Sequence, residues 1–155
     1  MDYNFQFIRN KINLILNKFI RNDLTLLSND LHEVTVSHKI GEYIQMEFPE
    51  WHVDCEYNRN LSHIKELWES NFRPDIVVHI RNTRKNLLVV EVKKATSKPE
   101  EIDADRKRVQ ELTIAESFLY QFGLVIILPD NKETKELISE WYSAGKLVEK
   151  LAERI

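Results

Sequence analysis

Two apolar segments in the middle of the chain each carry an acidic residue where a buried strand would hold an apolar one. The first covers residues 74–80 and has Asp75 near its start, and the second covers 87–94 and has Glu91 near its end. Apolar residues fill nearly every other position and do not alternate with polar ones, which predicts strands covered on both faces. The sequence therefore predicts two buried carboxylates within a sheet.

The polar residues 81–86 separate these segments, so the simplest arrangement is an antiparallel hairpin. The far ends of such a hairpin bring Asp75, Glu91 and Lys93 together. Because side chains alternate along a strand, Glu91 and Lys93 share one face, whereas the residues on either side of Glu91 point into the opposite layer. We therefore expect the lysine to lie beside the two acids.

Two converging carboxylates repel each other, and burying either one alone is costly, so a cation between them is expected. Oxygen ligands of this kind suit Mg²⁺ or Mn²⁺, with water in the remaining positions. The simpler alternative is a structural ion pair between Lys93 and one acid. It would leave the second acid unexplained, and buried ion pairs stabilise a fold less than apolar packing does. The sequence thus favours a metal site formed by Asp75 and Glu91.

The length and composition are those of an ordinary globular protein. At 155 residues, 43 % apolar and 30 % charged, the chain is expected to form one domain over 1–155. The start has no basic leader, and no apolar run reaches membrane-spanning length, so we expect a cytoplasmic protein without a membrane partner. The single cysteine, Cys55, excludes an intrachain disulfide and is expected to be a small buried side chain.

Positive charge is concentrated around the two apolar segments. The net charge is −3, yet residues 71–110 hold ten Lys or Arg against six Asp or Glu, a local balance of +4 that leaves −7 for the rest. Two of those six acids are the expected metal ligands. Both a solvated charged face and a nucleic-acid contact explain this excess, and the sequence leaves both open.

Hydrophobic periodicity and breaker residues predict the other elements. In chain order these are a helix over 5–19, a helix over 31–48, a strand over 51–57, a polar loop from 58, a helix over 103–120, a strand over 123–129, a helix over 132–142 and a short helix ending at 155. Helices therefore cover both faces of a mixed sheet, which is an α/β fold.

The order helix, strand, strand, strand, helix, strand over about 31–128 resembles the PD-(D/E)xK nuclease superfamily. Its signature stands here as Pro74-Asp75 and Glu91-Val92-Lys93. The chain is also similar to uncharacterised bacterial members through His38 to Glu42, residues 54–58, Arg73-Pro74-Asp75 and Glu91 to Lys94. The resemblance implies a restriction-endonuclease-like mixed central sheet with helices on both faces, an α-β-β-β-α-β core, and extra N- and C-terminal helices.

The resemblance also implies roles for individual residues. Asp75 and Glu91 would bind the metal with help from the Val92 carbonyl, and Lys93 would hold or activate the attacking water. Glu42 corresponds to the helical acid that often completes the site, although an exposed pair of Glu42 with a histidine four residues earlier is a common and functionally silent arrangement. The chemistry is phosphodiester hydrolysis, in which Lys93 supplies positive charge or, with a lowered pKa, accepts a proton.

Five polar residues around the signature are candidates for nucleic-acid contacts. Arg108 stands where the family usually has lysine, and its planar fork suits phosphate contact better than proton transfer. Lys107 and Gln110 are neighbouring candidates on the same helix, whereas Arg73 and Lys94 flank the two acids. For Arg73 and Lys94, a solvated surface side chain is the alternative.

Two classes of function follow. The first is a metal-dependent nuclease acting on DNA, with an endonuclease as the expected kind; RNA is the alternative substrate, because the attack on a phosphodiester does not depend on the sugar. The second is a catalytically silent nucleic-acid-binding or assembly module of the same fold. The complete set of Asp75, Glu91 and Lys93 favours the nuclease. With no room for a separate sequence-reading module, a homodimer or a partner protein is expected to contribute.

Overall fold

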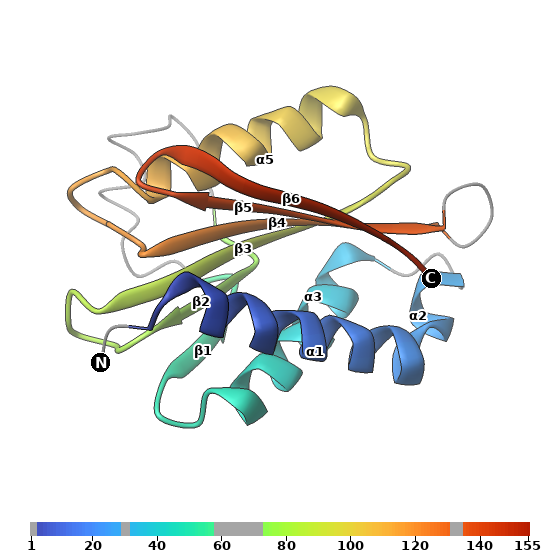
Figure 1. The fold of residues 1–155 in the computed structure, drawn as a ribbon, viewed down its shortest axis with the longest axis horizontal. Coiled ribbons are helices and arrows are strands. Elements are labelled where there is room, and N and C mark those ends of the chain that lie inside the picture. Colours follow the sequence, from blue (N-terminus) through green and yellow to red (C-terminus); the bar gives the residue numbers. More distant parts are fainter. Residues whose placement is uncertain (1–2, 29–31, 58–72, 131–134) are drawn as a thin grey trace.

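The computed structural model describes residues 3–28, 32–57, 73–130 and 135–155. Within these residues, six strands form one mixed sheet in the order β1-β2-β3-β4-β5-β6, with helices on both faces (Figure 1). The strands are β1 His52–Cys55, β2 Ile76–His79, β3 Asn86–Lys94, β4 Phe122–Leu128, β5 Glu136–Ser143 and β6 Lys146–Arg154. The helices are α1 Phe5–Asp23, α2 Thr25–Ser28, α3 Glu33–Glu47 and α5 Pro99–Leu112. The protein therefore has the expected α/β architecture.

Strands β3 and β4 run parallel and α5 connects them, whereas every other neighbouring pair is antiparallel. A parallel pair needs a crossover connection, and the helix that provides it covers one face of the sheet. All four residues of β2 and all seven of β4 are buried. In β3, residues 87–92 are buried and the two ends are half-buried. The antiparallel hairpin of β2 and β3, and the burial of both strands over these residues, are therefore confirmed.

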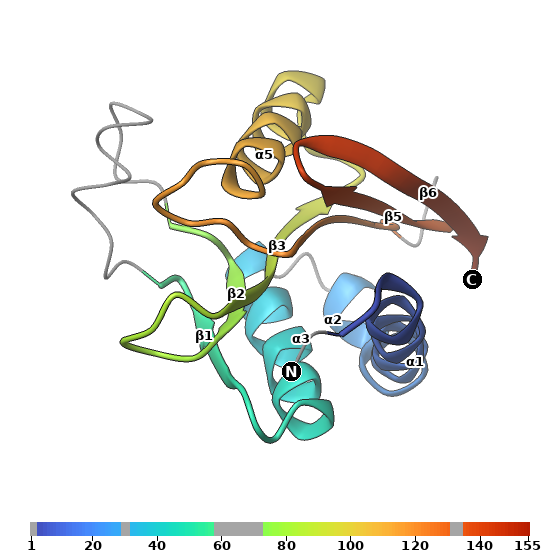
Figure 2. The ribbon, with the colours of Figure 1, turned by 60° about the vertical axis from the view of Figure 1, so that its left-hand side comes forward.

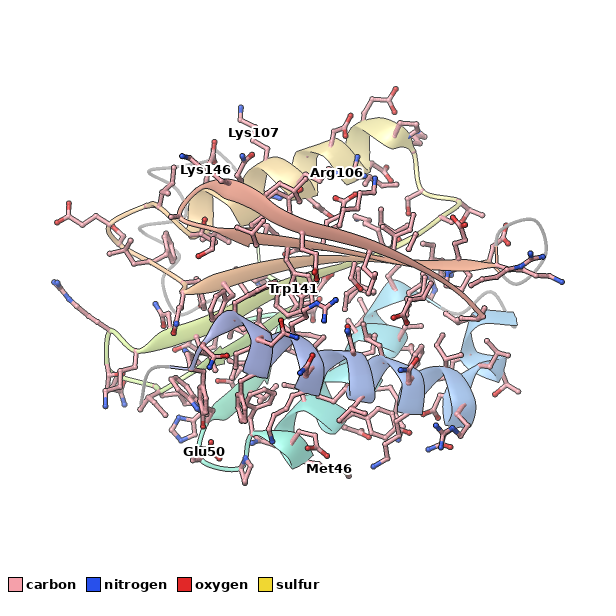
Figure 3. All side chains as sticks on the ribbon, in the orientation of Figure 1. Met46, Glu50, Arg106, Lys107, Trp141 and Lys146 are labelled. Atoms are coloured by element: carbon pink, nitrogen blue, oxygen red, sulfur yellow. The ribbon has the colours of Figure 1, made fainter. Side chains whose placement is uncertain are left out.

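The helices divide the core into two layers (Figure 2). Helices α1 and α3 lie on one face, where Phe19 and Ile40 pack with Trp141 of β5 in the larger core. The ring of Trp141 is fully buried and meets Phe5 edge to face at 5.5 Å, where β5 faces α1 (Figure 3). Helix α5 covers the other face through Val109 and Leu112. None of the described helices has the length and apolar character needed to cross a bilayer.

The N-terminal half follows the sequence-based expectations closely. The predicted helices over 5–19 and 31–48 correspond to α1 and α3, and α3 ends just before Phe48 and Pro49. The strand predicted over 51–57 is the shorter β1. The polar loop predicted from residue 58 lies outside the described residues.

The predicted C-terminal helices are wrong, because residues 136–154 form the hairpin of β5 and β6. The many Glu and Lys residues in this segment favour a helix when considered alone. Pairing with β4 overrides that preference, since it buries the aromatic residues Trp141 and Tyr142 on opposite faces of the sheet. Ala144 and Gly145 form the turn and both have positive φ, 49° and 75°, as tight hairpin turns require.

Helix α5 is also shifted relative to the prediction of 103–120. It begins at Pro99, which suits a first-turn position, and its first turn carries Glu100 and Glu101. It ends at Leu112, where Thr113 donates its backbone N–H to the carbonyl of Gln110. Residues 113–121 then form the connection to β4, so the acidic residues at 103–105 lie inside the helix and not at its start.

Gly123 sets how closely α5 approaches β4, and its replacement tests that packing. A Cβ at Gly123 would lie 2.4 Å from Cγ1 of Val109 and 3.2 Å from Cγ2 of Thr113, so α5 would have to move outward. We expect Gly123→Ala to lower the free energy of unfolding by about 1–3 kcal/mol in urea titrations, as overpacked cores do.

Gly41 of α3 provides the matched control for that substitution. A Cβ at Gly41 would lie 2.8 Å from Sγ of Cys55, a single side-chain atom that can turn away. Alanine also favours the helix by about 1 kcal/mol over glycine, so Gly41→Ala should be nearly neutral. Equal destabilisation by the two substitutions would contradict the close α5–β4 contact.

Candidate active site

The ends of β2 and β3 are joined by their two acids. If the antiparallel register continued beyond β2, it would place Pro74 opposite Val92, but proline has no N–H to donate. The Val92 N–H instead donates to Oδ2 of Asp75 at 2.8 Å, and the Asp75 N–H donates to Oε1 of Glu91 at 3.3 Å. Each carboxylate therefore accepts a backbone hydrogen bond across the strand pair. The same arrangement leaves the Val92 carbonyl without a donor from Pro74.

Burial makes both carboxylates hard to ionise. Burial raises the pKa of Asp75 from 3.8 to about 6, although the Val92 N–H and a hydrogen bond with Glu91 act in the opposite direction. Glu91 is 3 % exposed, and burial together with the charges of Asp75 and Asp105 raises its pKa well above the ordinary value. Without a cation, the pair therefore favours a bound proton over two negative charges.

Lys93 projects on the same sheet face as Glu91, as expected, and two acids hold it. Its Nζ lies 3.3 Å from Oδ2 of Asp105 on α5 and 3.6 Å from Oε2 of Glu33 on α3. Burial alone would lower the pKa of Lys93, but the charges of Asp105 and Glu33 more than offset it and raise the pKa. Lys93 is therefore a cation at neutral pH, which favours charge stabilisation over proton acceptance.

Asp105 and Glu33 are the two site residues that the sequence did not single out. Asp105 is 1 % exposed and shares the sheet-facing stripe of α5 with Val109 and Leu112, at helical spacings of four and seven. An acid on that apolar stripe is a signal that sequence reasoning can recognise. Glu33 lies in the first turn of α3 and accepts from the Ser97 hydroxyl at 3.4 Å. Acids are common in first turns, so nothing in the sequence marks it.

Glu42 is exposed and pairs with a lysine of its own helix. Its side chain is 60 % exposed and pairs with Lys39 at 2.8 Å on the exposed side of α3, where His38 is also exposed. Burial raises the pKa of the Cys55 thiol to about 11, and the charges of Asp75 and other nearby acids, including Glu42, act in the same direction. The α3 acid that contacts Lys93 is Glu33 and not Glu42. His38 and Glu42 therefore both lie on the exposed side of α3.

Three of the candidate nucleic-acid contacts differ in position. Arg73 is exposed two residues before Asp75, at the entrance of β2, and Lys94 is half-buried at the end of β3. Lys107 is exposed on α5 and points away from the sheet (Figure 3). Arg73 and Lys94 are thus near the two acids along the chain, whereas Lys107 lies on the outer side of the helix.

The other two candidates form contacts within the protein. Arg108 is half-buried and forms an ion pair with Asp105 through Nη2, so it belongs to the network that holds Lys93. Gln110 donates from Nε2 to the carbonyl of Gly145 at 2.8 Å and ties α5 to the β5–β6 turn. The structure therefore gives Arg108 a place beside the cluster and gives Gln110 a structural contact.

The donor chemistry fits a small divalent cation. Asp75 and Glu91 are two carboxylates whose simultaneous ionisation needs positive charge, and Val92 offers a carbonyl that Pro74 cannot cap. Mg²⁺ is commonly held by one or two carboxylates and retains several waters. No group of three or more His, Cys, Asp and Glu side chains in the described part of the chain is arranged to hold a metal ion. The candidate set is therefore two carboxylates and one backbone oxygen.

Comparisons with known proteins give no relative. No family model, no curated protein and no solved structure matches this chain.

The raised pKa of Asp75 predicts that this side chain destabilises the fold above pH 6. Folding disfavours its ionised form, so the penalty is absent below about pH 4, grows between the ordinary pKa of 3.8 and the folded pKa of about 6, and is constant above. Without metal, Asp75→Asn should therefore increase the free energy of unfolding by about 2 kcal/mol at pH 8 and change it little at pH 3.5.

Chemical unfolding in EDTA at both pH values measures this difference. Glu136→Gln on β5 removes an exposed carboxylate and is the matched control, with an expected change within about 0.5 kcal/mol at either pH. If Asp75→Asn instead lowers the free energy of unfolding at pH 8, the ionised Asp75 side chain stabilises the fold and the prediction is wrong.

Proposed function

We propose that this protein is a metal-dependent nuclease that hydrolyses phosphodiester bonds of DNA, cutting as an endonuclease. The observation that carries the proposal is the joining of Asp75 and Glu91 at the end of a buried strand pair, with the charged Lys93 on the same face. The buried Glu91 and the half-buried Asp75 disfavour simultaneous ionisation, which lowers the stability of the fold, and a metal-binding role gives a reason for their presence.

The order of elements supports the same proposal. From α3 to β4 the chain runs helix, strand, strand, strand, helix, strand, which is the order of the restriction-endonuclease-like core in the PD-(D/E)xK superfamily. The Pro-Asp and Glu-x-Lys residues occupy neighbouring strand ends within this core. The additional β5–β6 hairpin extends the sheet on the far side from β1 and leaves these strand ends in place.

The protein groups have distinct roles in this proposal. Asp75, Glu91 and the Val92 carbonyl would hold Mg²⁺ or Mn²⁺; when bound, the ion polarises a phosphoryl oxygen and lowers the pKa of its water. Lys93 supplies fixed positive charge for the negative charge that develops on the phosphate. Asp105 and Glu33 orient the ammonium from two sides of the sheet end. Arg73, Lys94 and Arg108 provide further charge for a nucleic-acid strand, and a homodimer or a partner protein would complete its binding surface.

The second candidate function is a catalytically silent nucleic-acid-binding or assembly module. The observation that favours it is the engagement of Lys93 by two carboxylates, which reduces the positive charge available to a phosphate. An intact set of Asp75, Glu91 and Lys93 favours the nuclease. RNA is the alternative substrate, because the proposed chemistry at phosphorus is the same for both nucleic acids.

Cleavage assays test the proposed activity directly. Linear DNA, circular DNA, single-stranded DNA and RNA are incubated with the protein in Mg²⁺, Mn²⁺ or EDTA. We expect metal-dependent cutting of DNA that falls by at least about 100-fold in Asp75→Asn and Glu91→Gln, because each removes a proposed metal ligand, and in Lys93→Met, because it removes positive charge at the reacting phosphate. Glu136→Gln should cut at the wild-type rate. If the protein cuts none of these substrates although its spectrum shows that it is folded, the result would support the silent module.

A pair of substitutions distinguishes Glu33 from Glu42, two of the acids of α3. Glu33→Gln removes a carboxylate that orients Lys93 and should lower the cleavage rate by about 10-fold, since small displacements of a catalytic group are costly. Glu42→Gln removes an exposed carboxylate paired with Lys39 and should leave the rate within about 2-fold. The reverse order of effects would show that Glu42 is the helical acid of the site.

A further inference from the structure

A cavity lies on the same sheet face as Glu91, at the opposite end of β3. It has a volume of about 530 Å³ and opens between the β2–β3 turn and the loop that follows α5. This volume is in the usual range for small-ligand sites, about 300–1,000 Å³. Its lining combines aromatic and polar side chains, among them Tyr57, His79, Phe118, Arg84, Asn86 and Glu116.

Strand parity places this cavity on the face of the proposed active site. Val77 and Val89 belong to the core beneath α5, so His79 and Glu91, each two residues further along, project on that same face. Asn86 shares that face because a register shift between Val78 and His79 pairs it with His79. Asn86 and Glu91 are five residues apart on β3, which corresponds to at most about 17 Å along a strand. A few nucleotides of a single strand can span that distance.

The His79 wall of the cavity is held in place from several sides. His79 is 4 % exposed, and its Nε2 lies 2.8 Å from Oδ2 of Asp54 on β1. Arg81 donates from Nε to the same oxygen at 2.8 Å. The Tyr57 ring meets the imidazole edge to face at 4.5 Å, and Glu56, the residue before it, has a positive φ of 51°. This wall is therefore preorganised and aromatic.

The opposite wall of the cavity is fixed to β3 through Asn86. Asn86 donates from Nδ2 to the carbonyl of Phe118 at 2.5 Å, and its own carbonyl accepts the N–H of Gln121 at 2.9 Å. Phe118 is buried, whereas Glu116 is exposed beside it on the rim. The cavity therefore combines the half-buried Tyr57 ring, beside the largely buried His79 and Phe118, with a carboxylate acceptor at Glu116 and a cation at Arg84.

Each of these groups matches one part of a nucleotide. Aromatic side chains stack on the flat face of any base, a contact of about 1–3 kcal/mol per base. A carboxylate accepts from exocyclic amines, which adenine, cytosine and guanine have and thymine lacks. The Arg84 guanidinium on the rim suits a phosphate oxygen.

We propose that this cavity binds a nucleobase with an exocyclic amine, as part of a nucleotide whose phosphate contacts Arg84. A base of a single-stranded substrate and a free nucleotide present the same chemistry. Only the first of these sources rests on the proposed nuclease function, in which the cavity would hold a nucleotide a few positions from the bond that is cut.

Titration of ¹⁵N-labelled protein followed by NMR tests the proposal without metal and without cleavage. The probes are the 5′-monophosphates of deoxyadenosine, deoxycytidine, deoxyguanosine and thymidine, with ribose 5-phosphate as the probe that lacks a base. We expect saturable shifts of the amides at 82–84 and 116–119, at least threefold tighter binding of the three amine-bearing nucleotides than of thymidine monophosphate, and no saturable shift with ribose 5-phosphate.

Two variants define the base contact. Glu116→Gln should remove most of the preference over thymidine monophosphate, whereas Glu100→Gln, an exposed acid at the other end of α5, should keep it. Both changes lie on the surface, and the NMR spectrum itself reports folding. Equal binding of ribose 5-phosphate, shifts outside the cavity, or no shift at 10 mM of any nucleotide would overturn the proposal.

A short oligonucleotide separates the two sources of the base. A single-stranded tetranucleotide that binds at least 10-fold more tightly than the best mononucleotide, and shifts the amides of 91–94 as well, identifies a substrate strand. Equal affinity, with shifts confined to the cavity, identifies a free nucleotide. Asp75→Asn should bind mononucleotides like the wild type in both cases, so failure of the nuclease proposal and failure of this one are distinguishable.

Discussion

The reciprocal contact between Asp75 and Glu91 is the interaction on which the proposed site depends. Each carboxylate accepts a backbone N–H across the β2–β3 pair at the point where Pro74 cannot continue the ladder. The contact holds two acids together in a place where burial raises the pKa of both. Without a cation, the pair is most stable when one acid holds a proton. A bound divalent cation would stabilise the pair with both acids ionised.

The parallel pairing of β3 and β4 then determines what surrounds the acids. It requires the crossover through α5, and the sheet-facing stripe of that helix places Asp105 against Lys93. Glu33 reaches the same ammonium from α3, so helices on opposite faces of the sheet meet at one strand end. The charge of Lys93 is therefore fixed by its neighbours. The site combines acids that resist ionisation with a lysine that resists deprotonation.

Local patterns in the sequence were enough to predict the strand pair and its acids, because unbroken apolar runs and strand alternation are properties of neighbouring residues. Partners distant in sequence were not predictable in this way. Glu140 favours a helix locally, yet it is buried in β5. There it accepts two hydrogen bonds, both of 2.7 Å, from Arg106 of α5. Glu33 has the unremarkable position of a first-turn acid. Asp105 on the apolar stripe of α5 was recognisable, and the error in the start of that helix hid it.

The most direct test of the account measures metal and proton exchange together at this pair. Calorimetric titration with Mn²⁺ near pH 6.5, in two buffers of different ionisation enthalpy, reports both the binding and the number of protons released. We expect saturable binding with net proton release, and loss of both in Asp75→Asn. No binding, or binding without proton release that persists in Asp75→Asn, would contradict the claim that Asp75 and Glu91 form a cation site.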